Sequence, residues 1–402
     1  SSRGTFGKSG NTTISEYGVD FKLNFPKLFI PNKPNKFIPV EPNTYIILGT
    51  SKQTNIGLDR QTLKFDLNYE WKNKKDHKVN FGLLNIELVD NKNSFNYFNI
   101  YSNSFNTINN IALKSNVNSS YFDSYNKLII PLGINSFIND VTEKNLILDI
   151  EDFNTVNYIN DRRNRLTSNN LIISSNFSKI FNNGKNEFNR SFSQFRYKIE
   201  VAGTLTNFLA KQFNATKDQF ENRKILDLTY SQYFKTEINY IKHWPITSNS
   251  IIAIRGYFGI AVPFGNSDNI PFSKSFFSGG SNDNRAWEVY RLGPGSSGAN
   301  SEFNEANMKL AFNVEYRFGL IGKLDGAIFT DFGNIWNVYD NTNDPKRTFN
   351  NFKDLNEIAI GSGFGLRYNL GYFVLRLDMG LKTYNPALEV NERWLTDFKL
   401  KK

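Results

Sequence analysis

The residues best placed to do chemistry are an arginine in a glycine-rich stretch and two acids that follow it. Residues 278–298 read SGGSNDNRAWEVYRLGPGSSG, with Arg285 near the centre. A segment this rich in glycine and proline cannot form the interior of a strand or helix. Its large side chains, such as Trp287, exceed what a flexible tether needs. We therefore interpret it as an ordered loop that folds back and delivers Arg285 to another part of the chain.

Glu315 and Asp331 are the expected partners of Arg285. Each acid lies on a segment of alternating apolar residues, on the face opposite the apolar side chains. Consecutive antiparallel strands would bring the two carboxylates close together. A guanidinium can bridge both through its fork of donors, which a lysine does less well. The alternative is that these acids are ordinary charges paired along the wall of a sheet, and their spacing alone leaves both interpretations open.

Strands are the elements that must position these residues. Alternation predicts about twelve: 19–25, 44–52, 63–71, 79–89, 170–181, 194–205, 227–241, 251–262, 307–320, 324–336, 357–370 and 372–382. Many have nine or more residues, the length of a tilted membrane strand, and no convincing amphipathic helix lies between them. We predict an all-β fold, a transmembrane antiparallel β-barrel. A sandwich of two sheets with one hydrated face is the alternative.

The placement of aromatic and charged residues favours the barrel. Aromatic residues lie at or just beyond strand ends, where a membrane girdle belongs; they are Tyr69, Trp71, Tyr240, Trp244, Trp336 and Tyr372. Charged residues such as Arg367 cannot face hydrocarbon, so they must line the interior. Gly361, Gly363 and Gly365 share that interior face and leave room for an inserted loop.

The least legible part of the chain is 91–165, which is dense in Asn and Ser. It could be an extracellular insertion or contain short helices, and the sequence does not choose. Its polar groups would go unpaired in lipid, so we expect it to lie outside the hydrocarbon. We predict one β-barrel domain over 1–402, with an insertion at about 91–166 and an inward-folded loop at about 263–305.

Composition excludes several classes of function. The 402 residues include 48 Lys and Arg against 38 Asp and Glu, a net charge of +10, but the positive residues are scattered and form no basic helix. Nucleic acid is therefore not an expected partner. Cysteine is absent, and His77 and His243 lie far apart, so neither a metal site nor a cofactor is expected. The GSGFG run at 361–365 lacks the lysine of a phosphate loop, and we predict that the chain is not an enzyme.

The loop and the strands after it resemble the BamA/TamA family of outer-membrane assembly proteins, including its surface-antigen barrels. Residues 278–298 resemble the sixth extracellular loop of that family, whose tip reads Arg-Gly-aromatic; Ala286 replaces the glycine here. EYRF at 315–318 and FTDFGNIW at 329–336 resemble the next two strands, and LGPGS at 292–296 is most similar to the lipoprotein form, TamL. The resemblance implies that Arg285 reaches Glu315 and Asp331. The implied loop motif is Gly279, Gly280, Arg285, Trp287, Gly293 and Gly295.

The resemblance also implies a location and a role. Family barrels have 16 strands, so the chain is expected to be incomplete at both ends. The expected location is the outer membrane of a Gram-negative bacterium. The expected role is assisting the insertion of β-barrel proteins or the export of envelope material. Expected partners are outer-membrane lipid, nascent outer-membrane proteins, and a TamB-like periplasmic protein or other assembly-complex subunits. A passive porin or plugged structural barrel is the main alternative, and a β-rich adhesin in solution is a third; substrates and lipidation stay open.

Overall fold

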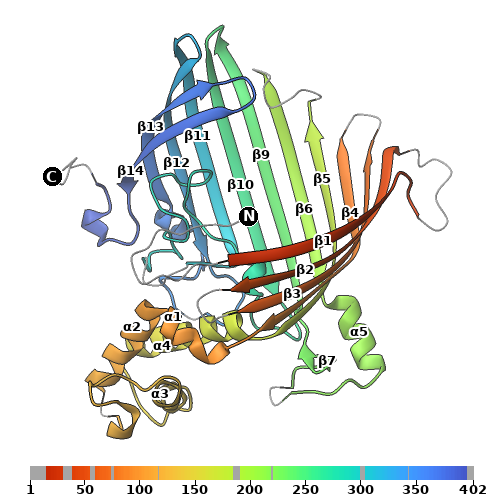
Figure 1. Cartoon of the computed structure of the whole chain (residues 1–402). Helices are drawn as coiled ribbons and strands as arrows, with labels where there is room; N and C mark the ends of the chain where they lie inside the picture. Colours follow the sequence, from red (N-terminus) through yellow and green to blue (C-terminus); the bar gives the residue numbers. More distant parts are fainter. Residues whose placement is uncertain are drawn as a thin grey trace.

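A computed structural model describes residues 15–29, 39–54, 59–73, 77–115, 117–183, 191–218, 221–298, 304–342 and 344–395. One antiparallel sheet of twelve strands dominates it, in the order β1-β2-β3-β4-β5-β6-β9-β10-β11-β12-β13-β14 (Figure 1). The strands are β1 (Ser15–Phe25), β2 (Val40–Thr54), β3 (Arg60–Lys72), β4 (Lys78–Asn91), β5 (Asn170–Asn182), β6 (Phe192–Ala202), β9 (Tyr233–Thr247), β10 (Ser250–Pro263), β11 (Met308–Ile321), β12 (Leu324–Trp336), β13 (Ala359–Asn369) and β14 (Val374–Tyr384). A two-stranded ladder, β7 (Lys224–Ile225) and β8 (Leu228–Thr229), lies between β6 and β9.

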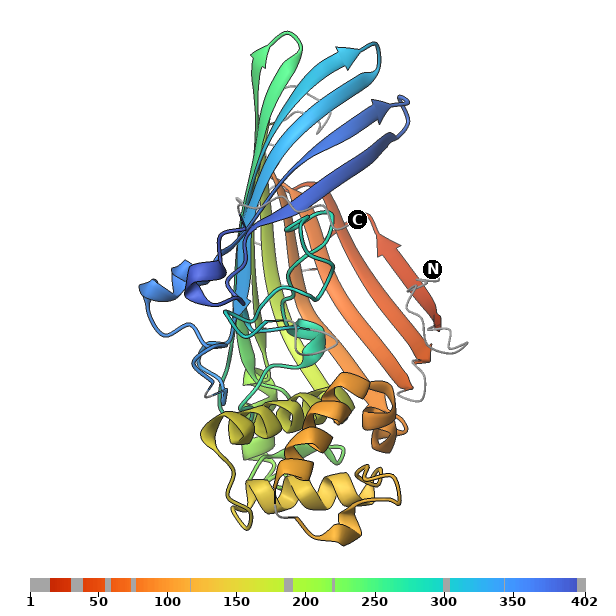
Figure 2. The ribbon, with the colours of Figure 1, turned by 90° about the vertical axis from the view of Figure 1, so that its left-hand side faces the viewer.

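The sheet curves around a central space, and β1 and β14 form its two edges (Figures 1 and 2). Its strands are 11 to 15 residues long, enough to cross a hydrocarbon core when tilted. The described residues show no pairing between β1 and β14. Each of the twelve predicted strands is present in the sheet.

The outer face of the sheet is apolar. Ile328 on β12 is 59% exposed and Leu377 on β14 is 72% exposed, while their sequence neighbours face the interior. The same outward exposure is seen for Val19, Phe21, Phe195, Ile199, Phe234, Ile238, Phe312, Tyr316, Phe364, Leu366, Leu375 and Met379. So large an apolar surface needs a covering, and lipid supplies one.

The two ends of the sheet differ in the length of their connections. At one end β9–β10, β11–β12 and β13–β14 are joined by turns of a few residues. At the other end lie the long segments 92–169, 203–232, 264–307 and 337–358. Outer-membrane barrels have short periplasmic turns and longer extracellular loops, so the long-loop end corresponds to the outside.

A helical cap, residues 94–167, joins β4 to β5 beyond the long-loop end (Figure 1). It contains α1 (Tyr97–Ile100), α2 (Ser102–Lys114), α3 (Leu132–Thr142) and α4 (Ile150–Thr167). Its helices pack on their own core, formed by Ile108, Ile134, Phe137, Ile138, Val141 and Val156. The expectation that no amphipathic helix separates the strands is therefore wrong. In α2 the helical spacing of Phe105, Ile108 and Ile111 is diluted by asparagines, which are weak helix formers.

Two strand boundaries also differ from prediction. The segment predicted as strand 194–205 stops at Ala202, because Gly203 adopts φ 73° and begins α5 (Thr204–Gln212). β9 starts and ends later than the predicted 227–241 and runs on through Pro245. That proline lies past the last β6 partner of β9, His243, so its missing N–H breaks no bond to β6. No helix within the described ranges is long and apolar enough to cross a membrane.

The predicted aromatic girdle is wrong for two of its members. Trp336 is fully buried, packs on Phe349 and donates its indole N–H to the Glu357 carboxylate at 2.9 Å. Tyr69 is 5% exposed, and its hydroxyl donates to the Phe29 carbonyl. Connecting segments cover both side chains, a contact that strand periodicity cannot reveal. Trp244 and Tyr372 are exposed, as a girdle requires.

Candidate functional site

The segment between β10 and β11 folds back along the inner face of the sheet (Figure 2). Within it, Ser278 pairs with Leu292 and closes a narrow loop. The Asp283 carboxylate accepts hydrogen bonds from Ser278 Oγ at 2.8 Å and from the Gly279 N–H at 2.7 Å. Gly279 has φ 98°, and a Cβ there would lie 2.2 Å from the Glu288 carbonyl oxygen, so only glycine fits. These contacts give the loop tip a fixed shape.

Arg285 lies at that tip and contacts both predicted acids. Its Nε and Nη2 donate to the two carboxylate oxygens of Asp331, both at 2.8 Å, and Nη1 donates to Glu315 Oε2 at 2.5 Å. The Arg285 backbone N–H also donates to Asp331, at 3.0 Å. The guanidinium carbon lies 3.3 Å from the centroid of the Phe329 ring. We call Arg285, Glu315 and Asp331 the inner anchor.

The register of β11 and β12 explains why one arginine reaches two acids. Asp331 pairs with Asn313 and Glu315 pairs with Phe329, so the two acids are diagonal neighbours on the inner face. Asp331 is completely buried and Glu315 is 6% exposed. In such a place an unpaired carboxylate is costly, and the forked bond of Arg285 satisfies both.

Other side chains complete the site, and sequence reasoning did not assign them to it. Asn313 Nδ2 donates to Asp331 Oδ1 at 2.8 Å and to the Asp283 carbonyl at 2.7 Å. Arg317 and Arg367 donate to Glu315 at 2.6 and 2.9 Å. Asn313 and Arg317 lie two positions before and two positions after Glu315, on the same face of β11. A search for polar residues on that face would therefore have found both, but not Arg367 on β13.

Glycines in the wall make room for the loop tip. A Cβ at Gly361 on β13 would lie 2.7 Å from the Ala286 Cβ, and one at Gly380 on β14 would lie 2.6 Å from the Arg285 carbonyl oxygen. The methyl group of Ala286, where the family tip has glycine, therefore fits because position 361 has no side chain.

The remaining residues of the predicted motif pack the parts of the loop on either side of its tip against neighbouring residues. Trp287 is buried in a cluster with Leu292 and Ala359. Gly293 has φ 74° and lies close to Asn334, where a Cβ would be 2.3 Å from the side-chain oxygen. Gly295 has φ 51° and lies against the Lys346 carbonyl. Gly280, with φ 102°, lies against Val289. Each predicted glycine thus lies at a close approach or a positive φ.

A second arginine–carboxylate contact fastens the outer part of the loop to the helical cap. Arg165 on α4 donates through Nη1 and Nη2 to the two oxygens of Glu305, at 3.0 and 2.6 Å. Burial lowers the pKa of Arg165, but Glu305 more than offsets this and the pKa is raised. We call Arg165 and Glu305 the outer anchor. Nearby, the Arg347 guanidinium lies 3.7 Å from the centroid of the Tyr158 ring.

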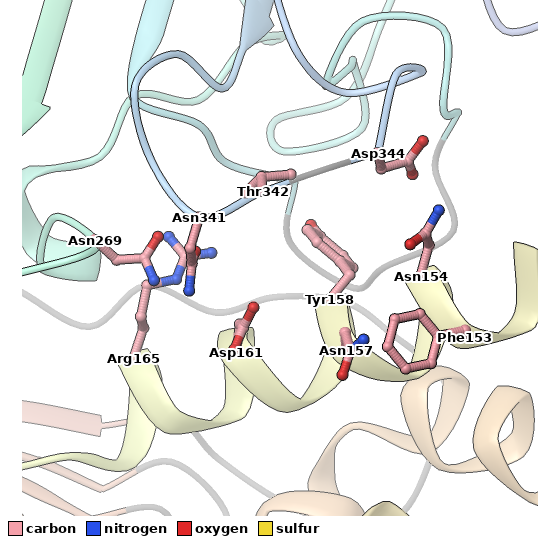
Figure 3. A pocket seen from close by; sticks show the side chains of 10 residues that line it. All are labelled: Phe153, Asn154, Asn157, Tyr158, Asp161, Arg165, Asn269, Asn341, Thr342 and Asp344. Atoms are coloured by element: carbon pink, nitrogen blue, oxygen red, sulfur yellow. The ribbon is translucent and has the colours of Figure 1, made fainter. Parts of the chain in front are cut away.

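A polar cavity of about 140 Å³ lies beside the outer anchor (Figure 3). Tyr158, Asp161 and Arg165 of α4 line one side, and Asn341 and Thr342 of the β12–β13 connection line the other. Burial raises the pKa of Asp161, an effect that Arg165 opposes. Burial also raises the pKa of the neighbouring Asp340 to about 6, although the Thr342 backbone N–H and Arg165 favour its ionised form.

The chemistry of the inner anchor is that of a positioning contact. No group of three or more His, Cys, Asp or Glu side chains in the described part of the chain could hold a metal ion. Arg285 bears a permanent charge and joins a loop to two strands. It can hold the loop on the wall.

A curved antiparallel sheet with an apolar outer face and an arginine-bearing loop on its inner face defines a transmembrane β-barrel with an inserted loop. The Omp85 superfamily domain matches residues 9–394, and the chain belongs to that superfamily. It is therefore an outer-membrane β-barrel protein of a Gram-negative bacterium, among proteins of outer-membrane assembly and translocation. The predicted BamA/TamA type is confirmed, and the closer likeness to TamL stays a prediction.

Individual proteins are similar to this chain to different degrees. The chain is 28% identical over 121 residues to outer membrane protein assembly factor BamA of Neisseria meningitidis serogroup B, covering 27% of this chain and 15% of that protein. It resembles BamA from Haemophilus ducreyi lacking POTRA domains 1–3, with a TM-score of 0.54 and 12% identity over 92% of this chain and 60% of that one. CdiB from Escherichia coli gives a TM-score of 0.40 and 12% identity, covering 85% and 46%. The chain thus spans a minor part of the curated relative and about three fifths of the first structure.

Proposed function

We propose that this protein is an outer-membrane translocation and assembly factor that assists the insertion of β-barrel proteins or the export of envelope material. The observation that carries the proposal is the inner anchor, where Arg285 holds the loop tip on Asp331 and Glu315. BamA, an assembly factor by name, is similar to this chain in sequence and fold. The expected partners are outer-membrane lipid and nascent outer-membrane proteins. A TamB-like periplasmic protein or other assembly-complex subunits are further expected partners.

The lumen favours this role over that of an open porin. The loop packs on β11, β12, β13 and β14 through Glu315, Asp331, Gly361 and Gly380. The helical cap is fastened to the same loop at the long-loop end. A wide, steady conductance in planar bilayers would instead identify a porin, because loop and cap together would obstruct such a channel.

Crosslinking in cells tests the proposal directly. A photoreactive residue at Leu377 on β14, at one edge of the described sheet, should capture newly made outer-membrane barrel proteins, because backbone groups at a sheet edge are free for pairing. The matched control is Phe312 on β11, which also faces outward but lies within the sheet. Equal capture at both positions, or none at Leu377 during active synthesis of barrel proteins, contradicts the assembly role.

Depletion distinguishes assembly from a plugged structural barrel. Loss of an assembly factor should lower the amount of folded barrel proteins or exported envelope material in the outer membrane. Restoring the wild-type chain should reverse the loss, whereas Arg285→Ala should restore less than Arg196→Ala, which alters a β6 arginine away from the inner anchor. Unchanged envelope composition on depletion would favour the structural barrel.

A further inference from the structure

A cavity of about 620 Å³ lies in the lumen, between the loop tip and the short-turn end of the sheet. Arginines from four strands and from the loop line it: Arg255, Arg285, Arg317, Arg367 and Arg376. They belong to β10, β11, β13 and β14 and to the loop, so the fold brings them together from distant parts of the chain.

The carboxylates that contact these arginines are too few to neutralise them. Glu315 alone accepts from Arg285, Arg317 and Arg367. Asp378 contacts Arg367 and Arg376 at 3.0 and 2.8 Å. Asp331 is the third such acid, and it pairs with Arg285.

The other nearby acids do not neutralise the remaining positive charge of these arginines. Asp283 lines the cavity but pairs with Lys309 at 3.0 Å. Asp325 stands opposite Arg367 in the register of β12 and β13, but it does not line the cavity. Five guanidinium groups therefore face three carboxylates, leaving an excess of positive charge in a confined space.

Several donors of these arginines remain free. Arg367 is 6% exposed, and its Nη1 is buried without a hydrogen-bond partner among the described residues. Arg317 donates through Nε to Glu315 Oε1; its side chain is 38% exposed, and its two terminal nitrogens make no hydrogen bond within the described part of the chain. A buried donor without an acceptor is costly, so an acceptor brought by a ligand would be favoured.

The neighbouring arginines hold the edge of the cavity in place. Arg255 Nη1 donates to the Asn282 carbonyl at 2.7 Å, and Arg376 Nη2 donates to the Ser281 carbonyl at 3.1 Å. These bonds tie β10 and β14 to adjacent residues of the loop. The free donors of Arg317 and Arg367 therefore face a space with fixed walls.

We propose that this cavity is a binding site for a phosphate group. Guanidinium forks match the oxygen spacing of phosphate and bind it more selectively than a point charge would. The group can come from free inorganic phosphate or from a small phosphate ester such as a lipid headgroup. Arg285 and Glu315 of the inner anchor line this cavity, but phosphate binding does not depend on the proposed role in assembly.

Calorimetry with the purified full chain in non-ionic detergent tests the site. Sodium phosphate, titrated at constant ionic strength with chloride as the balancing ion, should bind saturably at one site per chain. Arg317→Gln and Arg376→Gln, both at partly exposed side chains, should each weaken binding at least about tenfold. Arg317→Lys should recover only part, because it restores the charge without the fork.

The matched control is Arg196→Gln, on β6 and outside the cavity. Each variant should keep the heat-modifiable migration of a folded barrel, which separates lost binding from lost folding. No saturable binding of phosphate by the folded wild-type chain overturns the proposal. So does an Arg196→Gln variant that loses as much affinity as Arg317→Gln.

Competition identifies the source of the phosphate. Glycerol 3-phosphate that displaces inorganic phosphate at lower concentration supports a headgroup ligand. Failure of glycerol 3-phosphate to compete supports free phosphate. Saturable binding of an acidic peptide by a folded chain that does not bind phosphate overturns the assignment and points to a polypeptide ligand.

Discussion

The inner and outer anchors both use an arginine fork, but they differ in how many elements each fork joins. Arg285 meets two carboxylates on two strands and also stacks on Phe329. Among the described residues the carboxylate that Arg165 meets is that of Glu305, and the further cap contact of Lys346 with Glu151 at 3.3 Å is exposed and weak. The inner contact therefore fixes the loop to the barrel wall, whereas the outer one joins two connecting segments. We expect the loop tip to be the more rigid region.

Removing the arginine of the inner anchor should have the largest effect on stability. Arg285→Ala leaves Asp331 fully buried with no cation and Glu315 with only Arg317 and Arg367, at a cost of about 3–5 kcal/mol. The loop should become accessible to protease, and Arg285→Lys should restore protection only in part. Limited proteolysis of the membrane-embedded protein measures this. A loop that stays protected in Arg285→Ala would show that glycine packing alone holds it.

Breaking the outer anchor should destabilise the protein less, and its effect should be confined to the helical cap. Arg165→Gln leaves the Glu305 carboxylate, 2% exposed, without its partner, a loss of about 2–3 kcal/mol. Hydrogen exchange should speed up in α4 and remain unchanged at the loop tip. Arg163→Gln, on the same helix but paired with Asn135 and Asn160, is the control. Faster exchange at the tip as well would mean that the two anchors are coupled.

A side chain on the wall should displace the loop without touching any charge. Gly361→Val would place a Cβ 2.4 Å from Asn284 Oδ1 and 2.7 Å from the Ala286 methyl, an overpacking cost of about 2 kcal/mol. Thermal unfolding in detergent should show a lower Tm. Ser362→Val, the next residue on β13 and on the outward face, should leave Tm nearly unchanged. An equal fall in Tm for both variants would mean that the loss of stability comes from the strand itself and not from the loop contact.

The outer region should also respond to pH, whereas the inner fork carries a permanent arginine charge. Burial raises the pKa of Asp340 to about 6, so the folded protein holds this proton more tightly than the unfolded chain does. The stability contribution is complete below the unfolded pKa of about 4 and is lost as pH rises through 6. The opening free energy of α4, taken from exchange rates corrected for the pH dependence of intrinsic amide exchange, should therefore be lower at pH 7.5 than at pH 5 by about 1–2 kcal/mol. Asp340→Asn should remove that difference, and a pH dependence that survives it would assign the effect to another group.

Strand periodicity predicted the barrel and placed both acids on its inner face, whereas the pairing of Arg285 with these acids was left open by the spacing and was implied by the resemblance to the BamA/TamA family. Glu315 and Asp331 lie on the polar face of alternating strands, and that information is local. The outer anchor was missed because Arg165 and Glu305 lie 140 positions apart, on segments without strand alternation. Short helices were one of two alternatives for 91–165, and the sequence did not decide between them because asparagine dilutes the apolar spacing of the helical cap. Trp336 was misplaced because the connection that covers it, residues 337–358, has no strand alternation from which its fold could be predicted.

The order of the chain has a consequence for how the barrel forms. The loop at 264–307 is synthesised before the two acids that hold its tip and the two glycines that make room for it, since Glu315, Asp331, Gly361 and Gly380 all follow. A docking surface assembled from four later strands cannot exist until the last of them has paired. Docking of the loop on the inner wall is thus a late event in folding. In a chain truncated before β14, the surface that receives Arg285 should be incomplete and the loop should remain undocked.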